Sequence, residues 1–433
     1  MSFVFSSLNH AQRVPLAAEI HSRPFLKLDD PTLLTHLAIV GEQDQHELLA
    51  GLCGHFGVAA PAAGGKYFSH DFGRFRLKWE LHTEFATYTF AEEVRAMPLP
   101  EEAFGSMPVR HLPEQWLLAL QGRVLVAAHV MLARPGGTQE AFAASLQRVF
   151  QGAPLAGSQV MQGGELWTDF AIHADGFSRF VVCDAGMHQQ QAGRLVQRVL
   201  EIETYRMMAL LGLPYAQQAT PELNAVEAEL ATLAAALVEA DGKADDGTTE
   251  QRLLDQITHL AARLEKLSLD NSYRFAASKA YFSLVNARIE ELRELRIEGA
   301  PTVEEFMERR LAPALKTCEA VAARQEALAR RIANSNDLLR TRVGIVQEAQ
   351  NRQILQSLNA RALQQLRLQQ AVEGLSVAAI TYYVVGLAGY SAKGAKAFGW
   401  VGNPELLMGV LVPVVAAGVW LTLRNMHKRL HRA

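Results

Sequence analysis

Two long apolar segments near the C-terminus constrain this chain more than any other feature. They run from 372 to 390 and from 406 to 423 and are 19 and 18 residues long. At ~1.5 Å per residue, a helix of either length spans about 27 to 28 Å, close to the ~30 Å hydrocarbon core of a bilayer. The second segment contains no charged residue and is followed directly by a basic sequence. We therefore expect a C-terminal two-helix transmembrane hairpin rather than a buried hairpin of a soluble core.

The charges that flank these segments predict how the hairpin is oriented. The tail, residues 424–433, contains Arg424, Lys428, Arg429 and Arg432, whereas the loop between the segments has only two lysines and one glutamate. The positive-inside rule places such a tail in the cytoplasm, and a hairpin returns the chain to its starting side. The first residues lack the pattern of a signal peptide, and the three cysteines are far apart. We expect a multi-pass membrane protein with both termini in the cytoplasm.

Before the helices, the sequence indicates a mixed domain from residue 1 to 186. Residues 75–90 begin with strict alternation, which predicts one long strand with an apolar face and a charged face. The segments 166–172 and 177–183 flank an Asp-Gly pair that favours a hairpin turn. The fold class is therefore an α+β cytoplasmic domain. With 42 basic and 45 acidic residues, the chain lacks the positive charge expected of a nucleic-acid-binding protein.

From about residue 187 to 370 the pattern is that of a long helical stalk with coiled-coil character. Leu253, Ile257, Leu260, Leu264 and Leu267 recur at spacings of four and three residues, as in the seam of a coiled coil. Between 347 and 370, ten of 24 residues are Gln or Asn. Two interpretations stay open for this polar segment: a solvated helix face near the lipid headgroups, or a ring of polar side chains around the axis of a symmetric oligomer.

A stripe of small and polar residues continues from this segment into the first apolar helix. Such residues allow close helix packing in lipid. The chain is therefore expected to form a homo-oligomer in the bilayer, with this stripe as its pore or its helix-packing interface. The stripe consists of Gln365, Gln369, Ser376, Ala379, Tyr383, Gly386 and Tyr390.

Standard catalytic motifs are absent from the sequence, including phosphate-binding glycine loops, GxSxG, HExxH and paired CxxC. Two polar clusters remain: His21 and Arg23 in the sequence HSRPF, and Glu80, His82 and Glu84 on one expected strand face. Two carboxylates and an imidazole can bind a divalent cation, although alternating charges on a strand most often form a solvated ladder. We expect no enzyme activity and no cofactor, with a divalent cation as the one alternative; whether the cluster binds a metal stays open.

Several blocks of the sequence resemble a family of bacterial membrane-anchored proteins, domain of unknown function 3422. They include HSRPF, KWELHTEFATYTF, LLRTRV and the residues 192–214, 271–297 and 366–387. The resemblance covers nearly the whole chain and implies a bacterial inner-membrane protein with a cytoplasmic domain and C-terminal helices. It implies no activity and no catalytic residues.

The layout also resembles that of CorA-type divalent-cation transporters, which carry a Gly-Met-Asn signature after the first span. Here that position reads GYSAKG, from Gly389 to Gly394, without the Met-Asn pair. This resemblance implies a homo-oligomeric ion transporter, channel or ion sensor. The alternative is a membrane-anchored scaffold that recruits a partner and transports nothing.

Overall fold

The computed structural model describes residues 8–14, 16–17, 24–28, 31–41, 45–62, 64–95, 99–134, 139–152, 154–188, 190–240, 248–397 and 404–430. The chain divides into two compact units. The first unit is Met1–Ala235 with Ile257–Asn334, and the second is Ala236–Gln256 with Ser335–Ala433. An α+β N-terminal region is thus followed by a long helical region, in agreement with that part of the predicted fold class.

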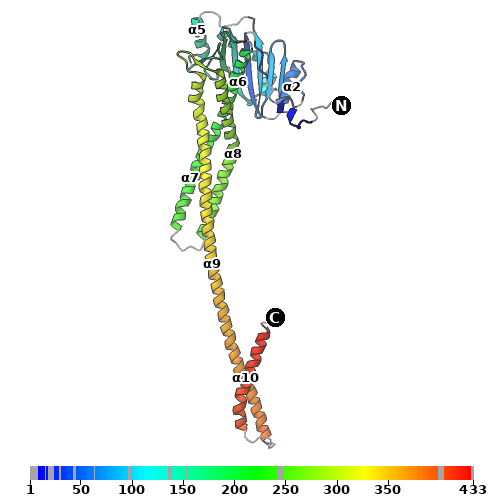
Figure 1. The fold of residues 1–433 in the computed structure, drawn as a ribbon, viewed down its shortest axis with the longest axis vertical. Helices are drawn as coiled ribbons and strands as arrows, with labels where there is room; N and C mark the ends of the chain where they lie inside the picture. Colours follow the sequence, from blue (N-terminus) through cyan, green and yellow to red (C-terminus); the bar gives the residue numbers. More distant parts are fainter. Residues whose placement is uncertain are drawn as a thin grey trace, which may run out of the picture. The chain divides into compact units, whose positions relative to one another are not determined.

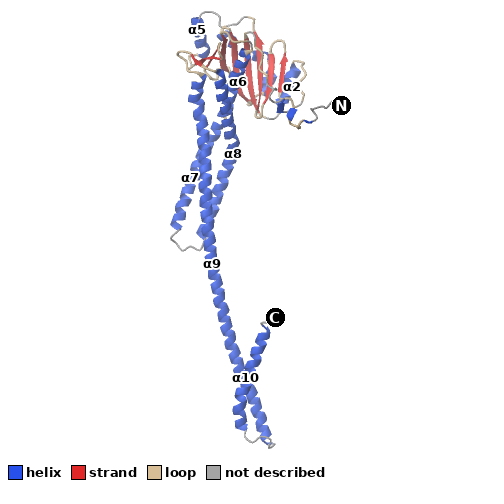
Figure 2. Ribbon diagram, in the orientation of Figure 1, coloured by secondary structure: helices blue, strands red, loops and turns tan. Residues whose placement is uncertain are grey.

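The first unit is built on a nine-stranded mixed sheet (Figure 2). Its strands follow the order β2-β3-β4-β1-β5-β8-β7-β6-β9. Neighbouring strands are antiparallel, except that β5 and β8 are parallel. The strand bounds are Thr32–Val40 (β1), Tyr67–Asp71 (β2), Arg76–Leu81 (β3), Phe85–Glu93 (β4), Val124–Ala133 (β5), Ala156–Val160 (β6), Gly164–Thr168 (β7), Ser178–Asp184 (β8) and Leu295–Arg296 (β9).

Helices connect the strands of the sheet and make up most of the described chain after β8 (Figure 1). Shorter helices lie between the first eight strands, and five long ones, α6 to α10, follow β8, with β9 between α8 and α9. Their bounds are Gln45–His55 (α2), Pro100–Phe104 (α3), Pro108–His111 (η2, a 3₁₀ helix), Glu114–Ala119 (α4), Gln139–Phe150 (α5), Gln191–Leu210 (α6), Gly212–Ala240 (α7), Thr248–Leu292 (α8), Val303–Ala397 (α9) and Pro404–Leu430 (α10).

The predicted boundaries of the parts differ from this division in one informative way. The long helices begin at Gln191, close to the boundary expected at residue 186. The sheet is not complete there, however, because β9 follows α8 and pairs with β6. The first unit therefore contains residues from both the predicted α+β domain and the predicted stalk.

The sheet has an apolar core on each of its faces. On one face, residues of α6 such as Leu195 and Val199 pack with Leu34 of β1 and Phe180 of β8. On the other face, residues of α2 and α4 pack with Leu77 and Trp79 of β3. The sheet is therefore a middle layer, and polar side chains on either face can be buried.

The long strand expected over residues 75–90 is wrong, because the chain reverses within it. β3 ends at Leu81, β4 begins at Phe85, and the two strands pair in an antiparallel hairpin. The turn has the backbone N–H of His82 donating to the carbonyl oxygen of Phe85 at 2.8 Å. The hairpin expected around the Asp-Gly pair is confirmed, since β7 and β8 are antiparallel neighbours.

Within the first unit, parts of α7, α8 and α9 lie side by side (Figure 1). Ion pairs join them, for example Arg263 of α8 with Glu229 of α7 at 2.7 Å. The seam predicted on α8 is buried at Ile257, Leu260 and Leu264. Three polar residues that continue the same spacing along α8 are also buried, namely Asn271, Arg274 and Ser278.

The second unit contains the part of α9 that follows Ser335, together with α10. At the start of this part, α9 contacts the end of α7: Arg342 donates a hydrogen bond to the carbonyl oxygen of Leu237 at 3.1 Å, and Leu339 is buried. Near its end α9 packs on α10, where a Cβ added at Gly389 would lie 2.7 Å from Cε of Met408.

Among the described residues, one helix is long and apolar enough to cross a membrane. It is the stretch Val303–Gly394, which contains most of α9. The apolar stretch of α10, Met408–Thr422, is shorter than a span requires among the described residues. Length and composition therefore identify one candidate span and leave the second as a prediction.

Candidate functional site

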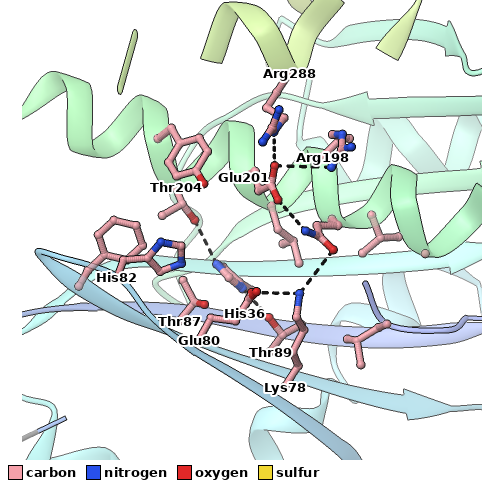
Figure 3. Close-up of a pocket in the computed structure, with 17 residues that line it drawn as sticks. His36, Lys78, Glu80, His82, Thr87, Thr89, Arg198, Glu201, Thr204 and Arg288 are labelled. Atoms are coloured by element: carbon pink, nitrogen blue, oxygen red, sulfur yellow. Dashed lines mark hydrogen bonds and ion pairs between the residues drawn. The ribbon is translucent and has the colours of Figure 1, made fainter. Parts of the chain in front are cut away.

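A polar pocket of about 220 Å³ lies in the first unit, between the sheet and α6 (Figure 3). β1, β3 and β4 supply one wall, α6 supplies the opposite wall, and α8 contributes one side chain. Its volume is about seven times the ~30 Å³ that one water molecule occupies in the liquid. The polar and charged residues that line it are His36, Lys78, Glu80, His82, Thr87, Thr89, Gln197, Arg198, Glu201, Thr204, Tyr205 and Arg288.

His36 forms the floor of the pocket and is held from two sides. Its Nδ1 lies 2.8 Å from Oγ1 of Thr89 on β4, and its Nε2 lies 3.1 Å from Oγ1 of Thr204 on α6. Burial, followed by the positive charge of nearby Lys78, lowers the pKa of His36 to about 3. The imidazole is therefore neutral at pH 7, so it can donate one hydrogen bond and accept one.

Lys78 is a buried cation beside this histidine. Its side chain is 5% exposed, and Nζ lies 3.0 Å from Oε2 of Glu80, two residues along β3. Nζ also donates to Oε1 of Gln197 on α6 at 3.4 Å. The expectation that the alternating charged residues on this strand face form a ladder exposed to water is wrong, because α6 covers the face and removes it from water.

Glu201 connects the α6 wall to α8. Its Oε1 accepts a hydrogen bond from Nε2 of Gln197 at 2.7 Å, and its Oε2 accepts one from Nε of Arg288. Arg288 continues to Glu291, where Nη1 lies 2.8 Å from Oε1, and Glu291 also pairs with Arg198. The network alternates carboxylates with cationic or amide donors, so each carboxylate has a donor. Figure 3 shows the part of it around Glu201.

The β3–β4 turn closes one end of the pocket. The His82 ring stacks on Phe85 at a centroid distance of 4.4 Å, and Phe85 lies against Tyr281 of α8 at 6.2 Å. Glu84 is not among the residues that line the pocket, and it receives two hydrogen bonds from Arg274 of α8, at 2.8 and 3.3 Å. Burial, followed by a hydrogen bond with Glu84, raises the pKa of Tyr281.

Near Gly193, the segment after Arg23 lies against α6. A Cβ at Gly193 would stand 2.0 Å from the carbonyl oxygen of Leu26, so only glycine allows this approach. The guanidinium of Arg194 lies over the Phe25 ring at 5.2 Å. The C-terminal part of the HSRPF block therefore positions Leu26, which lines the pocket.

The structure brings together only part of the predicted polar cluster. Glu80 and His82 line the pocket, whereas Glu84 pairs with Arg274. His21 and Arg23 lie outside the described residues. In the described part of the chain, no three His, Cys, Asp or Glu side chains are grouped as a metal site requires.

Sequence reasoning missed His36, Glu201 and Arg288. These residues come from β1, α6 and α8, and no local motif surrounds them. A partial signal exists in the spacing of Arg274, Tyr281 and Arg288, which recur every seven residues on α8 and so share one helix face.

The predicted stripe lies on α9 in the second unit. Gln365 and Gln369 are exposed, and Tyr383 and Tyr390 are 70% and 79% exposed. Ser376 and Gly386 are half-buried, and Ala379 is exposed. Tyr383, Gly386 and Tyr390 border a groove next to α10.

Comparison with known proteins finds one family. The model described as "Protein of unknown function (DUF3422)" matches residues 8–430. No curated protein matches, and no solved structure matches. The resemblance to CorA-type transporters is therefore unsupported, whereas the resemblance to domain of unknown function 3422 is confirmed.

Proposed function

Since this chain belongs to the DUF3422 family of proteins of unknown function, we propose a function from its own geometry. The protein is a membrane-anchored binding protein whose α+β unit binds a compact polar molecule in the pocket under α6. The observation that carries this proposal is the polar pocket with the buried side chains of Lys78 and His36 in its wall. Small-molecule sites are typically concave and lined by a few convergent polar groups, as this pocket is.

The charges of the pocket favour a ligand without net charge. Lys78, Arg198 and Arg288 are balanced by Glu80, Glu201 and Glu291 through the pairs described above. A ligand with net charge would leave one buried charge uncompensated, which costs several kcal/mol or more. An uncharged polyhydroxy molecule or a zwitterion can instead exchange hydrogen bonds with the threonine hydroxyls and the Gln197 amide.

A filled pocket tests this proposal. In Gln197→Phe the new ring occupies the space between α6 and β3, whereas Gln217→Phe places the same ring on an exposed position of α7. Small molecules that copurify with each protein would be released by denaturation and compared by mass spectrometry. A compact polar species retained by wild type and Gln217→Phe and lost from a folded Gln197→Phe supports binding. The same profile for all three proteins contradicts it.

Membrane anchoring is proposed to use two spans, 372–390 and 406–423, with both termini in the cytoplasm of a bacterial inner membrane. The apolar end of α9 supports the first span. The absence of charge from 406 to 423 and the basic tail support the second. A phosphatase fusion at Ala433 should be inactive and one at Ala395 active. An active fusion at Ala433 would contradict two spans and fit one.

A second candidate function is ion conduction by a homo-oligomer. The observation that favours it is the fully exposed, Gln- and Asn-rich segment of α9 that leads into the candidate span. Ion flux into liposomes that contain the purified protein should then exceed that of empty liposomes and fall in Gln369→Leu. Absence of flux leaves the anchored binding protein, or a scaffold for a partner protein, as the function.

A further inference from the structure

One segment of α9 is exposed on all of its faces. Before it, Leu339 is buried and Arg342 bonds to α7; after it, α10 packs at Gly389. Between these contacts every residue from 347 to 372 is exposed. Helical stability in proteins comes mostly from packing of an apolar face, and among the described residues no face of this stretch of about seven turns is buried.

The segment nevertheless carries a regular seam. Starting at Leu355, steps of three and four residues alternate through Leu358 and Ala362 to the predicted stripe, and they continue without interruption to Tyr390. A spacing of 3.5 residues sustained over five heptads is the pattern of helices that supercoil around one another. The seam residues, called a and d, are Leu355, Leu358, Ala362, Gln365, Gln369, Val372, Ser376, Ala379, Tyr383, Gly386 and Tyr390.

Apolar side chains gather on and beside this seam. Leu355 and Leu358 are 66% and 53% exposed at a and d positions. Ile354, Leu366 and Leu368 fall at the flanking e and g positions and are also more than half exposed. The other faces carry Gln356, Ser357, Ala360, Gln364 and Arg367, with Leu363 as the one large apolar residue.

We propose that this seam pairs with the same seam of a second copy of the chain, as a parallel coiled coil of α9 helices. The inference rests on the proposed membrane anchoring, because two copies inserted with the same topology have parallel α9 helices. A lipid surface does not fit as the partner, since α9 is one continuous helix and its apolar end crosses the bilayer.

Polar seam residues favour an identical partner. A glutamine amide has both donor and acceptor atoms, so Gln365 and Gln369 can each bond to the same residue of a copy in register. No charge falls at an a or d position, and Arg352, Arg361 and Arg367 lie outside the seam. In-register copies therefore meet without like-charge repulsion at the interface.

Two alanines two residues apart provide a matched test of the interface. Ala362 is on the seam and Ala360 is about 200° away around the helix, and both are exposed. We would oxidise membrane vesicles that contain full-length Ala362→Cys or Ala360→Cys; the native cysteines are buried. The disulfide-linked dimer should be at least ten times more abundant for Ala362→Cys. Equal amounts, a preference for Ala360→Cys, or no dimer in either variant would overturn the pairing.

Two leucines of similar exposure separate pairing from folding. Leu358 on the seam and Leu363 outside it are 53% and 57% exposed, so Leu358→Asp and Leu363→Asp disturb one chain to a similar degree. Native mass spectrometry in detergent should find monomers for Leu358→Asp and oligomers for Leu363→Asp. The same oligomeric state in both would overturn the inference. Alkaline extraction of these membranes distinguishes the two proposals: protein that stays in the membrane without pairing contradicts this inference alone, and protein that is released contradicts the anchor.

Discussion

Strand β3 and the middle of α9 are both regularly patterned polar segments, yet they end in opposite environments. Lys78 is 4% exposed and is paired on two sides, whereas every residue from 347 to 372 is exposed. The difference lies in what covers each segment. α6, more than a hundred residues later in the chain, packs over β3, and no described element packs over the middle of α9. Polarity along a segment therefore does not determine whether water reaches it.

The sharpest way to test this contrast is to remove a charge from each region. Lys78→Met leaves Glu80 largely buried without its cation, and removing one partner of a buried pair costs about 3 kcal/mol. Arg361→Met, on the exposed part of α9, should change the free energy of unfolding by less than about 0.5 kcal/mol. Urea unfolding of the detergent-solubilised protein, followed by tryptophan fluorescence, measures both.

A double variant shows whether the loss of stability in Lys78→Met comes from the unpaired charge of Glu80 or from the changed shape of the side chain. Lys78→Met/Glu80→Leu removes both charges and should recover at least about 1 kcal/mol relative to the single variant. If Lys78→Met is as stable as wild type, the pair is not buried in solution.

Acid should destabilise the α+β unit and spare the exposed part of α9, which has no histidine. His36 and His129 have pKa values lowered to about 3, mainly by burial. Between pH 6.5 and 3 the unfolded chain binds more protons at these sites, so stability falls as the pH falls through this window. At pH 5 each histidine should cost about 2 kcal/mol.

The measurement is the free energy of unfolding at pH 7 and at pH 5. His36→Gln should reduce the loss between these pH values by about 2 kcal/mol, whereas His259→Gln, at an exposed position of α8, should leave it unchanged. An unchanged loss in His36→Gln would mean that this histidine is not neutral and buried at pH 7.

Within the candidate span, two substitutions to leucine should affect association unequally. A Cβ at Gly386 meets no atom within 4 Å in the chain, so Gly386→Leu should leave packing on α10 intact and separate neighbouring copies. We expect about fivefold weaker association, ~1 kcal/mol, and no change for Val384→Leu. Cross-linking or native mass spectrometry measures both, and equal effects would exclude the stripe as the interface.

The smallest effect is expected at Gln356, which is exposed and lies outside the seam of α9. Gln356→Ala replaces an exposed residue with a slightly better helix former, so stability should change by less than about 0.5 kcal/mol. Oligomeric state, measured as above, should also be unchanged. A loss of oligomers in Gln356→Ala would mean that the contact surface of α9 lies on another side.

The sequence predicted the family and the order of an α+β region and a long helical region, because helical and strand periodicities and the quoted blocks are local. It failed at residues 82–84, where the chain turns without the glycine or proline that marks most turns. The alternating pattern also placed Lys78 and Glu80 on one face of the strand and Trp79 on the other. It could not predict which of the two strand faces helix α6 would cover. His36 and Thr204 meet across 168 residues of sequence, and no local pattern can predict such a pair.

The position of β9 has a consequence for the time course of synthesis. Ser158 of β6 bonds to Glu294, just before β9, across 136 residues that contain β7, β8 and three long helices. At ~5–20 residues per second, a ribosome takes about 7 to 27 s to make those residues. During that interval the edge of β6 that later pairs with β9 has no strand beside it. An open strand edge can pair with strands from other chains. Slower translation of α7 and α8 would lengthen this exposure, so the rate at which the helices are made governs how long the sheet stays open.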